Sequence, residues 1–342
     1  LPRRLEIAVS IEPDEAGTAG ALFHARNRLD ERFLLLNGGS LLDGNLAALL
    51  ADAARDDPAV VAGRLAVTTL PDTGRYGVVT LAGDVVTGFH ARPSIAGQAG
   101  LIHAGIAVLH RRILDTLPPR GSLERDVLPR LAATGALRAT ALPGWFIDIG
   151  EPDDLARAQA ELPRRLRRPA LFLDRDGVVN RDLGYVGSRD RFEWTADSRA
   201  AIRAASGAGW HVFIVTNQSG IAREYYREVD LVALHDWMVD EVRHAGGTID
   251  DLRYCPHHPE ATHAAYRRRC DCRKPAPGML RDLLHRWQVE PESCVLVGDQ
   301  PTDLAAAAAA GVRGIGFTGG SLLDAVVPLL DRAMHNVNCY RN

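Results

Sequence analysis

The sequence predicts two α/β domains, each built on a sheet of strands covered by helices. Its 342 residues exceed what one hydrophobic core usually supports, which favours two domains. Short apolar runs alternate with amphipathic segments of helical period, most regularly after residue 168, and this predicts a doubly wound parallel sheet in the second half. We place the domains at 1–162 and 169–330, with a linker at 163–168 and a tail at 331–342.

The N-terminal half alternates strands and helices and then becomes richer in short strands. The expected helices span 18–29, 46–54, 111–117 and 123–132. The expected strands span 5–10, 33–36, 60–67, 76–81, 85–90 and 101–109. This order predicts a Rossmann-like α/β domain. The arginine-rich run that follows it is either a solvated connector or the exposed end of a helix.

The C-terminal half alternates more regularly. Its expected strands span 170–173, 211–215, 252–254, 294–297 and 314–317, and its expected helices span 198–208, 229–245, 278–287 and 302–310. Such repeats predict a parallel sheet with helices on both faces, and these sheets bind ligands at the carboxyl ends of their strands. The side chains that follow each strand are therefore candidates for a site.

The composition argues against several classes of partner. The net charge is −3 and no basic tract is interleaved with aromatic residues, so we expect no nucleic-acid partner. No apolar run approaches the roughly 20 residues of a membrane helix, so we expect no membrane partner. Three of the five cysteines crowd into positions 255–272, which indicates a bound metal and a reducing cytoplasm. A small-molecule partner remains, and the sequence leaves the oligomeric state open.

Two carboxylates follow the first strand of the C-terminal half. Asp174 and Asp176 stand in a DRDG turn directly after the apolar run ALFL, where both side chains can face one pocket. Taken alone, such a turn is equally well explained as an ordinary polar loop. As a pair, they fit phosphate ester hydrolysis: Asp174 attacks phosphorus, and Asp176 protonates the leaving alkoxide and then activates water. Asp174 and the backbone carbonyl of Asp176 would also bind Mg²⁺.

Groups at three other points of the chain complete this chemistry. Thr216 and Asn217 end the strand VFIV with hydroxyl and amide groups suited to phosphate oxygens. Lys274 is the only lysine of the chain, and its ammonium would offset the charge of a phosphate dianion. Asp299 follows the strand VLV and would hold Mg²⁺ together with the DRDG turn.

The motifs D-x-D-G, Thr, Lys and G-D-x-x-x-D occur in an order that resembles the haloacid dehalogenase superfamily of phosphatases. Within it, the strings LFLDRDGVVN, VTNQSGIAR, YCPHHP and CDCRKPAPGM are similar to the heptose bisphosphate phosphatases, over about 170–317. The resemblance implies a haloacid dehalogenase-type fold. It also implies Mg²⁺-dependent hydrolysis of the 7-phosphate of D-glycero-D-manno-heptose 1,7-bisphosphate, a small-molecule sugar phosphate.

A group of cysteines and histidine lies shortly before the single lysine. Its C-x-H and C-x-C spacing provides three thiolates and one imidazole, the ligand set of a closed tetrahedral Zn²⁺ site. With no position open for water, a structural zinc is favoured over a catalytic one. The expected ligands are Cys255, His257, Cys270 and Cys272.

Arg273 is the candidate for substrate selection, because in the resembling family the arginine beside the motif lysine contacts the sugar phosphate. Gln300 departs from the family pattern, in which a basic residue tends to follow the metal-binding aspartate. Histidinol-phosphate phosphatases share the core motifs and a related zinc loop, and they are the alternative assignment. The twelve residues between His257 and Cys270 favour the heptose enzymes, whose loop is longer.

The N-terminal half resembles the sugar-1-phosphate nucleotidyltransferases over about 5–162, through GTAGAL, FLLLNGGS, RYGVV and GWFIDIGEP. The resemblance implies a metal ligand at Asp148. However, the chain starts after the family's Gly-rich nucleotide loop, Gly39 stands in place of a metal-binding aspartate, and Arg92 in place of a lysine. We expect this half not to transfer nucleotides, and to bind a sugar phosphate or serve oligomerisation. The alternative is a bifunctional phosphatase and heptose-1-phosphate nucleotidyltransferase.

Overall fold

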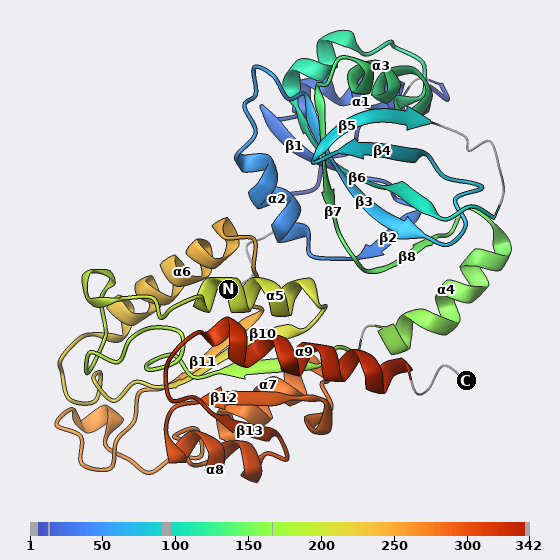
Figure 1. The fold of residues 1–342 in the computed structure, drawn as a ribbon. Helices are drawn as coiled ribbons and strands as arrows, with labels where there is room; N and C mark the ends of the chain where they lie inside the picture. The colour runs from blue at the N-terminus through green and yellow to red at the C-terminus, as the bar shows by residue number, and fades with distance from the viewer. Residues whose placement is uncertain (1–5, 13, 91–96, 166, 339–342) are drawn as a thin grey trace. The chain divides into compact units, whose positions relative to one another are not determined.

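A computed structural model describes residues 6–12, 14–90, 97–165 and 167–338, and it contains two compact units (Figure 1). One unit comprises Leu1–Asp43 and Asp52–Leu155, and the other comprises Gly44–Ala51 and Ala156–Asn342. The predicted α/β class is confirmed. Helix α4 (Pro152–Arg165) includes the first residues of the expected linker. Within the described ranges, no helix has both the length and the apolar character of a membrane span.

The C-terminal unit contains a five-stranded parallel sheet, as predicted. Its strands are β9 (Ala170–Leu173), β10 (His211–Asn217), β11 (Asp251–Cys255), β12 (Val295–Gly298) and β13 (Arg313–Gly316). They lie in the order β11-β10-β9-β12-β13, and every neighbouring pair is parallel. Because the chain builds first on one side of β9 and then on the other, the adjacent ends of β9 and β12 form the switch point at which such sheets bind ligands.

Helices cover both faces of this sheet (Figure 1). They are α5 (Ser198–Gly207), α6 (Glu228–His244), α7 (Gly278–Trp287), α8 (Pro301–Ala309) and α9 (Leu322–Asn338). Leu171 and Leu173 of β9 pack in one hydrophobic cluster with α5, α6 and α9, whereas Ala170 and Phe172 pack in another with α7 and α8. Burial on both faces explains why β9 is an uninterrupted apolar run.

The N-terminal unit is built on a mixed sheet. Its strands are β1 (Arg32–Leu36), β3 (Gly63–Leu70), β4 (Val78–Ala82), β5 (Val85–His90), β6 (Gly100–His110) and β7 (Leu137–Ala141), in the order β1-β6-β3-β7-β5-β4. The β3–β7 pair is parallel, and β6 runs antiparallel to both β1 and β3. Strands β2 (Ser40–Asp43) and β8 (Trp145–Asp148) form a separate antiparallel pair. The α-helices that precede α4 in the chain are α1 (Gly17–Ala25), α2 (Leu46–Ala54) and α3 (Leu128–Ala133), and the first six residues of α2 are assigned to the C-terminal unit.

Some N-terminal elements differ from the sequence prediction. The expected strand at 5–10 is wrong over its described part, because residues 6–10 have no strand partner and Ile7 and Val9 are exposed. An alternating apolar pattern is typical of a strand, but a strand also needs a neighbour. The expected helix at 111–117 is a 3₁₀ helix, and the one at 123–132 begins with a π-helical turn. The sequence pattern does not predict β2, β7, β8 or α9, and Arg92 lies outside the described residues.

Candidate active site and metal centre

Lys274 and Asp174 form a buried ion pair at the switch point of the parallel sheet. Asp174 directly follows β9, and its backbone amide donates to the carbonyl of Val297 in β12. The Lys274 ammonium donates to Asp174 Oδ1 at 2.7 Å and to the Val215 carbonyl at 2.9 Å. It also lies 2.6 Å from Asp303 Oδ1. All three protons of the ammonium thus have an acceptor, so the only lysine of the chain is fixed in place.

Burial governs the ionisation of this pair. It raises the pKa of Asp174 to about 7, against the opposing effect of Lys274. For Lys274, burial acts to lower the pKa, but the carboxylates of Asp174 and Asp303 outweigh it, and the pKa is raised. The lysine is therefore held as a cation, whereas Asp174 needs a further positive charge to be fully ionised at neutral pH.

Three carboxylates converge beside the lysine. One oxygen from each of Asp174, Asp299 and Asp303 lies within 4.8 Å of the others. Asp303 is already engaged, because it pairs with Lys274 and accepts the backbone amide of Gln300 at 3.0 Å. Asp299 keeps a buried Oδ1 without a hydrogen-bond partner in the described chain, and burial raises the pKa of its carboxyl group. An unpartnered buried oxygen near Asp174 fits a divalent cation that these two aspartates share.

Gly177 makes room for this arrangement. Its φ is +89°, a conformation that favours glycine, and a Cβ at this position would lie 2.4 Å from Asp299 Oδ2. The glycine of the DRDG turn is therefore required both by its backbone and by the close approach of Asp299.

Asp176 is anchored by side chains outside the carboxylate group. Its own carboxylate accepts hydrogen bonds from Arg175 at 2.8 and 2.9 Å, from Asn180 at 3.0 Å and from Gln218 at 2.7 Å. Arg175 is fully buried and also donates to the Val186 carbonyl at 2.6 Å. These bonds hold the carboxylate away from the cluster of three, which is consistent with metal binding through the Asp176 backbone carbonyl.

The two residues that end β10 have different surroundings. Thr216 is buried and lines the cleft, and its Oγ accepts a hydrogen bond from Gln218 at 2.8 Å. Asn217 also lines the cleft, but its amide bonds to the backbone of Lys274 in both directions, each at 3.1 Å. Asn217 thus fixes the position of the lysine, whereas Thr216 keeps its own hydroxyl proton for another acceptor.

These groups share one cleft of about 380 Å³ in the C-terminal unit. Arg273 is not among the described residues that line it, and its guanidinium donates instead to the His257 carbonyl at 3.3 Å. Further residues that line the cleft are Asp182, Gly184, Tyr185, Ser219, Tyr226, Gln300 and Thr302.

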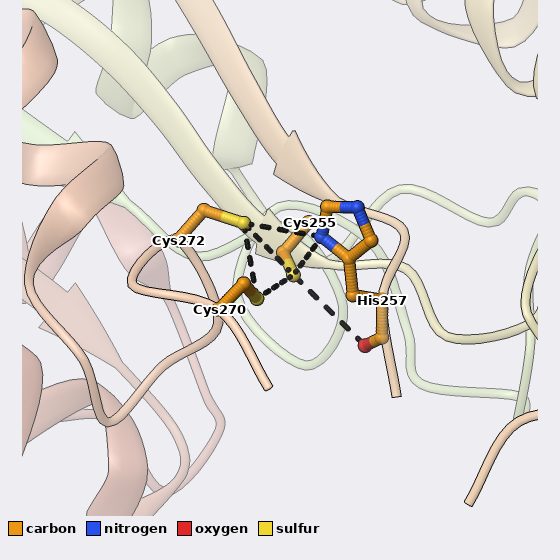
Figure 2. A group of neighbouring side chains, drawn as sticks. All are labelled: Cys255, His257, Cys270 and Cys272. Atoms are coloured by element: carbon orange, nitrogen blue, oxygen red, sulfur yellow. Dashed lines mark hydrogen bonds between the residues drawn. The ribbon is translucent and has the colours of Figure 1, made fainter. Parts of the chain in front are cut away.

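The four predicted zinc ligands lie together (Figure 2). The sulfurs of Cys255, Cys270 and Cys272 are 3.2, 3.3 and 3.5 Å apart, and His257 Nδ1 lies 3.4 and 3.7 Å from two of them. A tetrahedral zinc would place sulfurs about 3.8 Å apart, and a disulfide about 2.05 Å. The spacing therefore fits a closed metal site. Burial raises the pKa of the Cys255 thiol, so a metal would displace its proton on binding.

The N-terminal unit has its own cleft, of about 280 Å³, which contains Asp148. The Asp148 carboxylate accepts from Ser40 Oγ at 2.7 Å and from the amide of Gly150 at 2.9 Å. Gly39 lies beside it, because its carbonyl accepts the amide of Ile149. Among the residues that the structure describes, both clusters of three or more possible metal ligands lie in the C-terminal unit. Asp148 belongs to neither cluster, and glycine at position 39 offers it no second carboxylate.

The sequence interpretation gives no role to Arg175, Gln218 or Tyr226. Arg175 belongs to the string DRDG and Gln218 to the string TNQSG, and each is adjacent to a predicted site residue. Their positions in these motifs could therefore have pointed to them. Tyr226 follows its strand end by nine residues, and no periodicity connects the two. Its place in the cleft depends on the path of the intervening turn.

Comparison with family models gives two matches. Residues 271–333 match the HAD-hydrolase-like model, and residues 3–165 match the nucleotidyl transferase model. The two matches fall in different halves of the chain, as the sequence motifs indicate.

Curated relatives match the C-terminal half. A D-glycero-beta-D-manno-heptose-1,7-bisphosphate 7-phosphatase of Rhodopseudomonas palustris is 52% identical over 153 residues, which cover 45% of this chain and 85% of the relative. A D-glycero-alpha-D-manno-heptose-1,7-bisphosphate 7-phosphatase of Photorhabdus laumondii is 36% identical over 141 residues, 41% of this chain and 77% of the relative. Among solved structures, the D,D-heptose 1.7-bisphosphate phosphatase from B. bronchiseptica, complexed with magnesium and phosphate, is 33% identical, with coverage of 50% and 98% and a TM-score of 0.41.

Proposed function

Through its C-terminal half the chain belongs to the family of D-glycero-D-manno-heptose-1,7-bisphosphate 7-phosphatases, and we propose that it hydrolyses the 7-phosphate of the β anomer through an aspartyl-phosphate on Asp174. We propose the β anomer over the α anomer because the relative named for the β anomer is 52% identical, whereas the relative named for the α anomer is 36% identical. The chain is thus a phosphoric monoester hydrolase, and its substrate and mechanism are the proposal.

The convergence of Asp174, Lys274 and Asp299 carries the proposal. A phosphate ester is a dianion, so a carboxylate nucleophile can reach it only beside fixed positive charge. Lys274 supplies one such charge, 2.7 Å from Asp174. Asp174 and Asp299, with the Asp176 carbonyl, would hold Mg²⁺, which when bound supplies the charge that neutralises phosphoryl oxygens.

The remaining side chains have distinct tasks in this mechanism. Asp174 attacks phosphorus while Lys274 and Thr216 bind phosphoryl oxygens. The leaving alkoxide takes a proton from Asp176, whose carboxylate is held by Arg175 and Gln218. Asp176 then accepts a proton from the water that hydrolyses the acyl phosphate, which returns the enzyme to its starting state.

The cysteine and histidine group would hold a structural Zn²⁺. Its last ligand, Cys272, directly precedes Arg273 and Lys274, so an ordered zinc loop also fixes those two cations. Arg273 would turn from the His257 carbonyl to the second phosphate of the substrate. Since the zinc thiolates must stay reduced, we place the enzyme in the cytoplasm.

Phosphate release from the α and β heptose bisphosphates and from histidinol phosphate, with and without Mg²⁺, tests the assignment. We expect the β anomer to react fastest and activity to require Mg²⁺. Asp174→Asn should abolish turnover, while the circular dichroism spectrum stays unchanged and thermal unfolding stays cooperative. A preference for histidinol phosphate would refute the substrate, and an active Asp174→Asn variant would refute the mechanism.

A further inference from the structure

We propose that Tyr226 is a positioning residue of the phosphatase, and that it acts through Gln218 to orient Asp176 and Thr216. The inference rests on the proposed function, because it assigns tasks to Asp176 and Thr216 in that reaction. In this proposal, Tyr226 takes part in the mechanism without exchanging protons or binding phosphate itself.

The ring of Tyr226 packs against two glycines, Gly187 and Gly220. A Cβ on Gly187 would lie 2.2 Å from ring atoms of Tyr226, and a Cβ on Gly220 would lie 2.3 Å from them. Both distances are too short for any side chain, so the ring stays in place only because glycine occupies both positions. The two glycines come from separate segments of the chain, and they lie against different ends of the ring: Gly187 is close to Cγ, and Gly220 is close to Cζ and the hydroxyl.

The hydroxyl of Tyr226 donates to Gln218 Oε1 at 2.6 Å. A carboxamide has an acceptor oxygen on one side and a donor nitrogen on the other, so this bond decides which side of Gln218 points toward its other neighbours. Burial raises the pKa of Tyr226 to about 12, so the phenol keeps its proton and remains a donor at neutral pH.

The side-chain nitrogen of Gln218 donates hydrogen bonds to two residues of the proposed reaction. Gln218 Nε2 donates to Asp176 Oδ2 at 2.7 Å and to Thr216 Oγ at 2.8 Å, and the side chain is almost fully buried. If the amide turned over, its nitrogen would face the Tyr226 hydroxyl, and Asp176 Oδ2 and Thr216 Oγ would both lose the hydrogen bond that they accept from Gln218. Because Thr216 accepts from Gln218, its own proton is directed to another acceptor in the cleft, such as a phosphoryl oxygen.

Tyr226→Phe is the direct test, because it keeps the ring on the two glycines and removes only the hydroxyl. We expect kcat for a heptose bisphosphate to fall about tenfold and KM to change less than about threefold, since one neutral hydrogen bond that orients the reacting groups is lost. Tyr225→Phe is the matched control, because the adjacent Tyr225 is exposed and has no hydroxyl contact within the described structure. Its kcat should remain at the wild-type value.

A double-mutant cycle shows whether Tyr226 acts through Gln218. Gln218→Ala should lower kcat more than Tyr226→Phe does, and adding Tyr226→Phe to Gln218→Ala should have no further effect. Gly187→Ala, which displaces the ring instead of removing its hydroxyl, should reproduce the loss in kcat. Additive effects in the cycle, or an unchanged kcat of Tyr226→Phe, would overturn the proposal.

All variants are also assayed with p-nitrophenyl phosphate, so that this inference and the proposed function can fail separately. If the wild type hydrolyses this general ester but no heptose bisphosphate, the substrate assignment fails, and the cycle still reports on Tyr226. If the wild type acts on both and Tyr226→Phe matches it, the role of Tyr226 alone is refuted.

Discussion

Lys274 forms a buried ion pair with Asp303, whose Oδ1 lies 2.6 Å from the ammonium. The same ammonium bonds to Asp174 at 2.7 Å, so the proposed nucleophile shares its cation with a second carboxylate. Sharing matters because an ammonium held by Asp174 alone would bind it more strongly and make it a weaker nucleophile. In the proposed mechanism, Asp303 therefore acts on the reaction through Lys274.

Replacing Asp303 by asparagine should therefore reduce both activity and stability. We expect kcat to fall about 100-fold, because electrostatic support of the phosphoryl group is disturbed. The free energy of unfolding should fall by about 1–3 kcal/mol, since Lys274 keeps one buried carboxylate and asparagine can still cap α8. Phosphate release and urea unfolding measure the two effects. Asp324→Asn, at the exposed start of α9, is the control, and a wild-type kcat in Asp303→Asn would contradict this role.

Mg²⁺ affinity should rise with pH up to about pH 7 and then level off. Burial raises the pKa of Asp174 to about 7, so below that pH a metal must displace a proton from the carboxyl group. One displaced proton makes the apparent affinity fall about tenfold for each pH unit below 7. Calorimetric titration at pH 6, 7 and 8 in buffers of different ionisation enthalpy measures both affinity and proton release.

The same shift has a consequence for the metal-free protein. Between the usual aspartate pKa of about 3.9 and the folded value of about 7, the folded state holds a proton that the unfolded state has lost. This favourable contribution is complete below about pH 4 and is lost as the pH rises through 7. Asp174→Asn should remove both this slope and the pH dependence of Mg²⁺ binding, and a pH-independent affinity in the wild type would rule out the competition.

The cysteine group should bind one zinc ion that the loop needs for order. Cys272→Ser should weaken zinc binding on the order of 100-fold or more and lower the activity as well, because the loss of a ligand frees the segment that carries Arg273 and Lys274. Elemental analysis and phosphate release measure these effects. Cys294→Ala is the matched control, because Cys294 is buried outside the group. Equal zinc content in the two variants would contradict the ligand assignment.

The N-terminal unit should not transfer nucleotides. Asp148 stands beside Gly39, where the resembling family has a second metal-binding aspartate, so a divalent cation lacks one of its anchors. We expect no pyrophosphate from heptose 1-phosphate with nucleoside triphosphates and Mg²⁺. Gly39→Asp should raise the affinity for Mn²⁺, measured by electron paramagnetic resonance, because a Cβ at this position meets no neighbour. Pyrophosphate formation by the wild type would show that the chain is bifunctional.

The strands that are buried on both faces are the ones that the sequence predicts most accurately. Strands β9, β10 and β12 are covered on both faces, so each is a continuous apolar run between a helix and a polar turn, and the sequence alone locates them. Residues 6–10 show the opposite case. Their alternation of apolar side chains is typical of a strand, but no neighbouring strand pairs with them, and pairing is a property of the tertiary fold.

The sequence by itself predicted the candidate site residues of the C-terminal half and that they meet at one edge of a sheet. It could do so because residues that directly follow parallel strands lie at the same edge whatever the rest of the chain does. The tertiary structure decided how three chemically identical aspartates differ. Asp174 is buried against Lys274, Asp176 is held by Arg175 and Gln218, and Asp303 neutralises the lysine. The behaviour of a carboxylate depends on its burial and its partners, and those come from segments far apart in the chain.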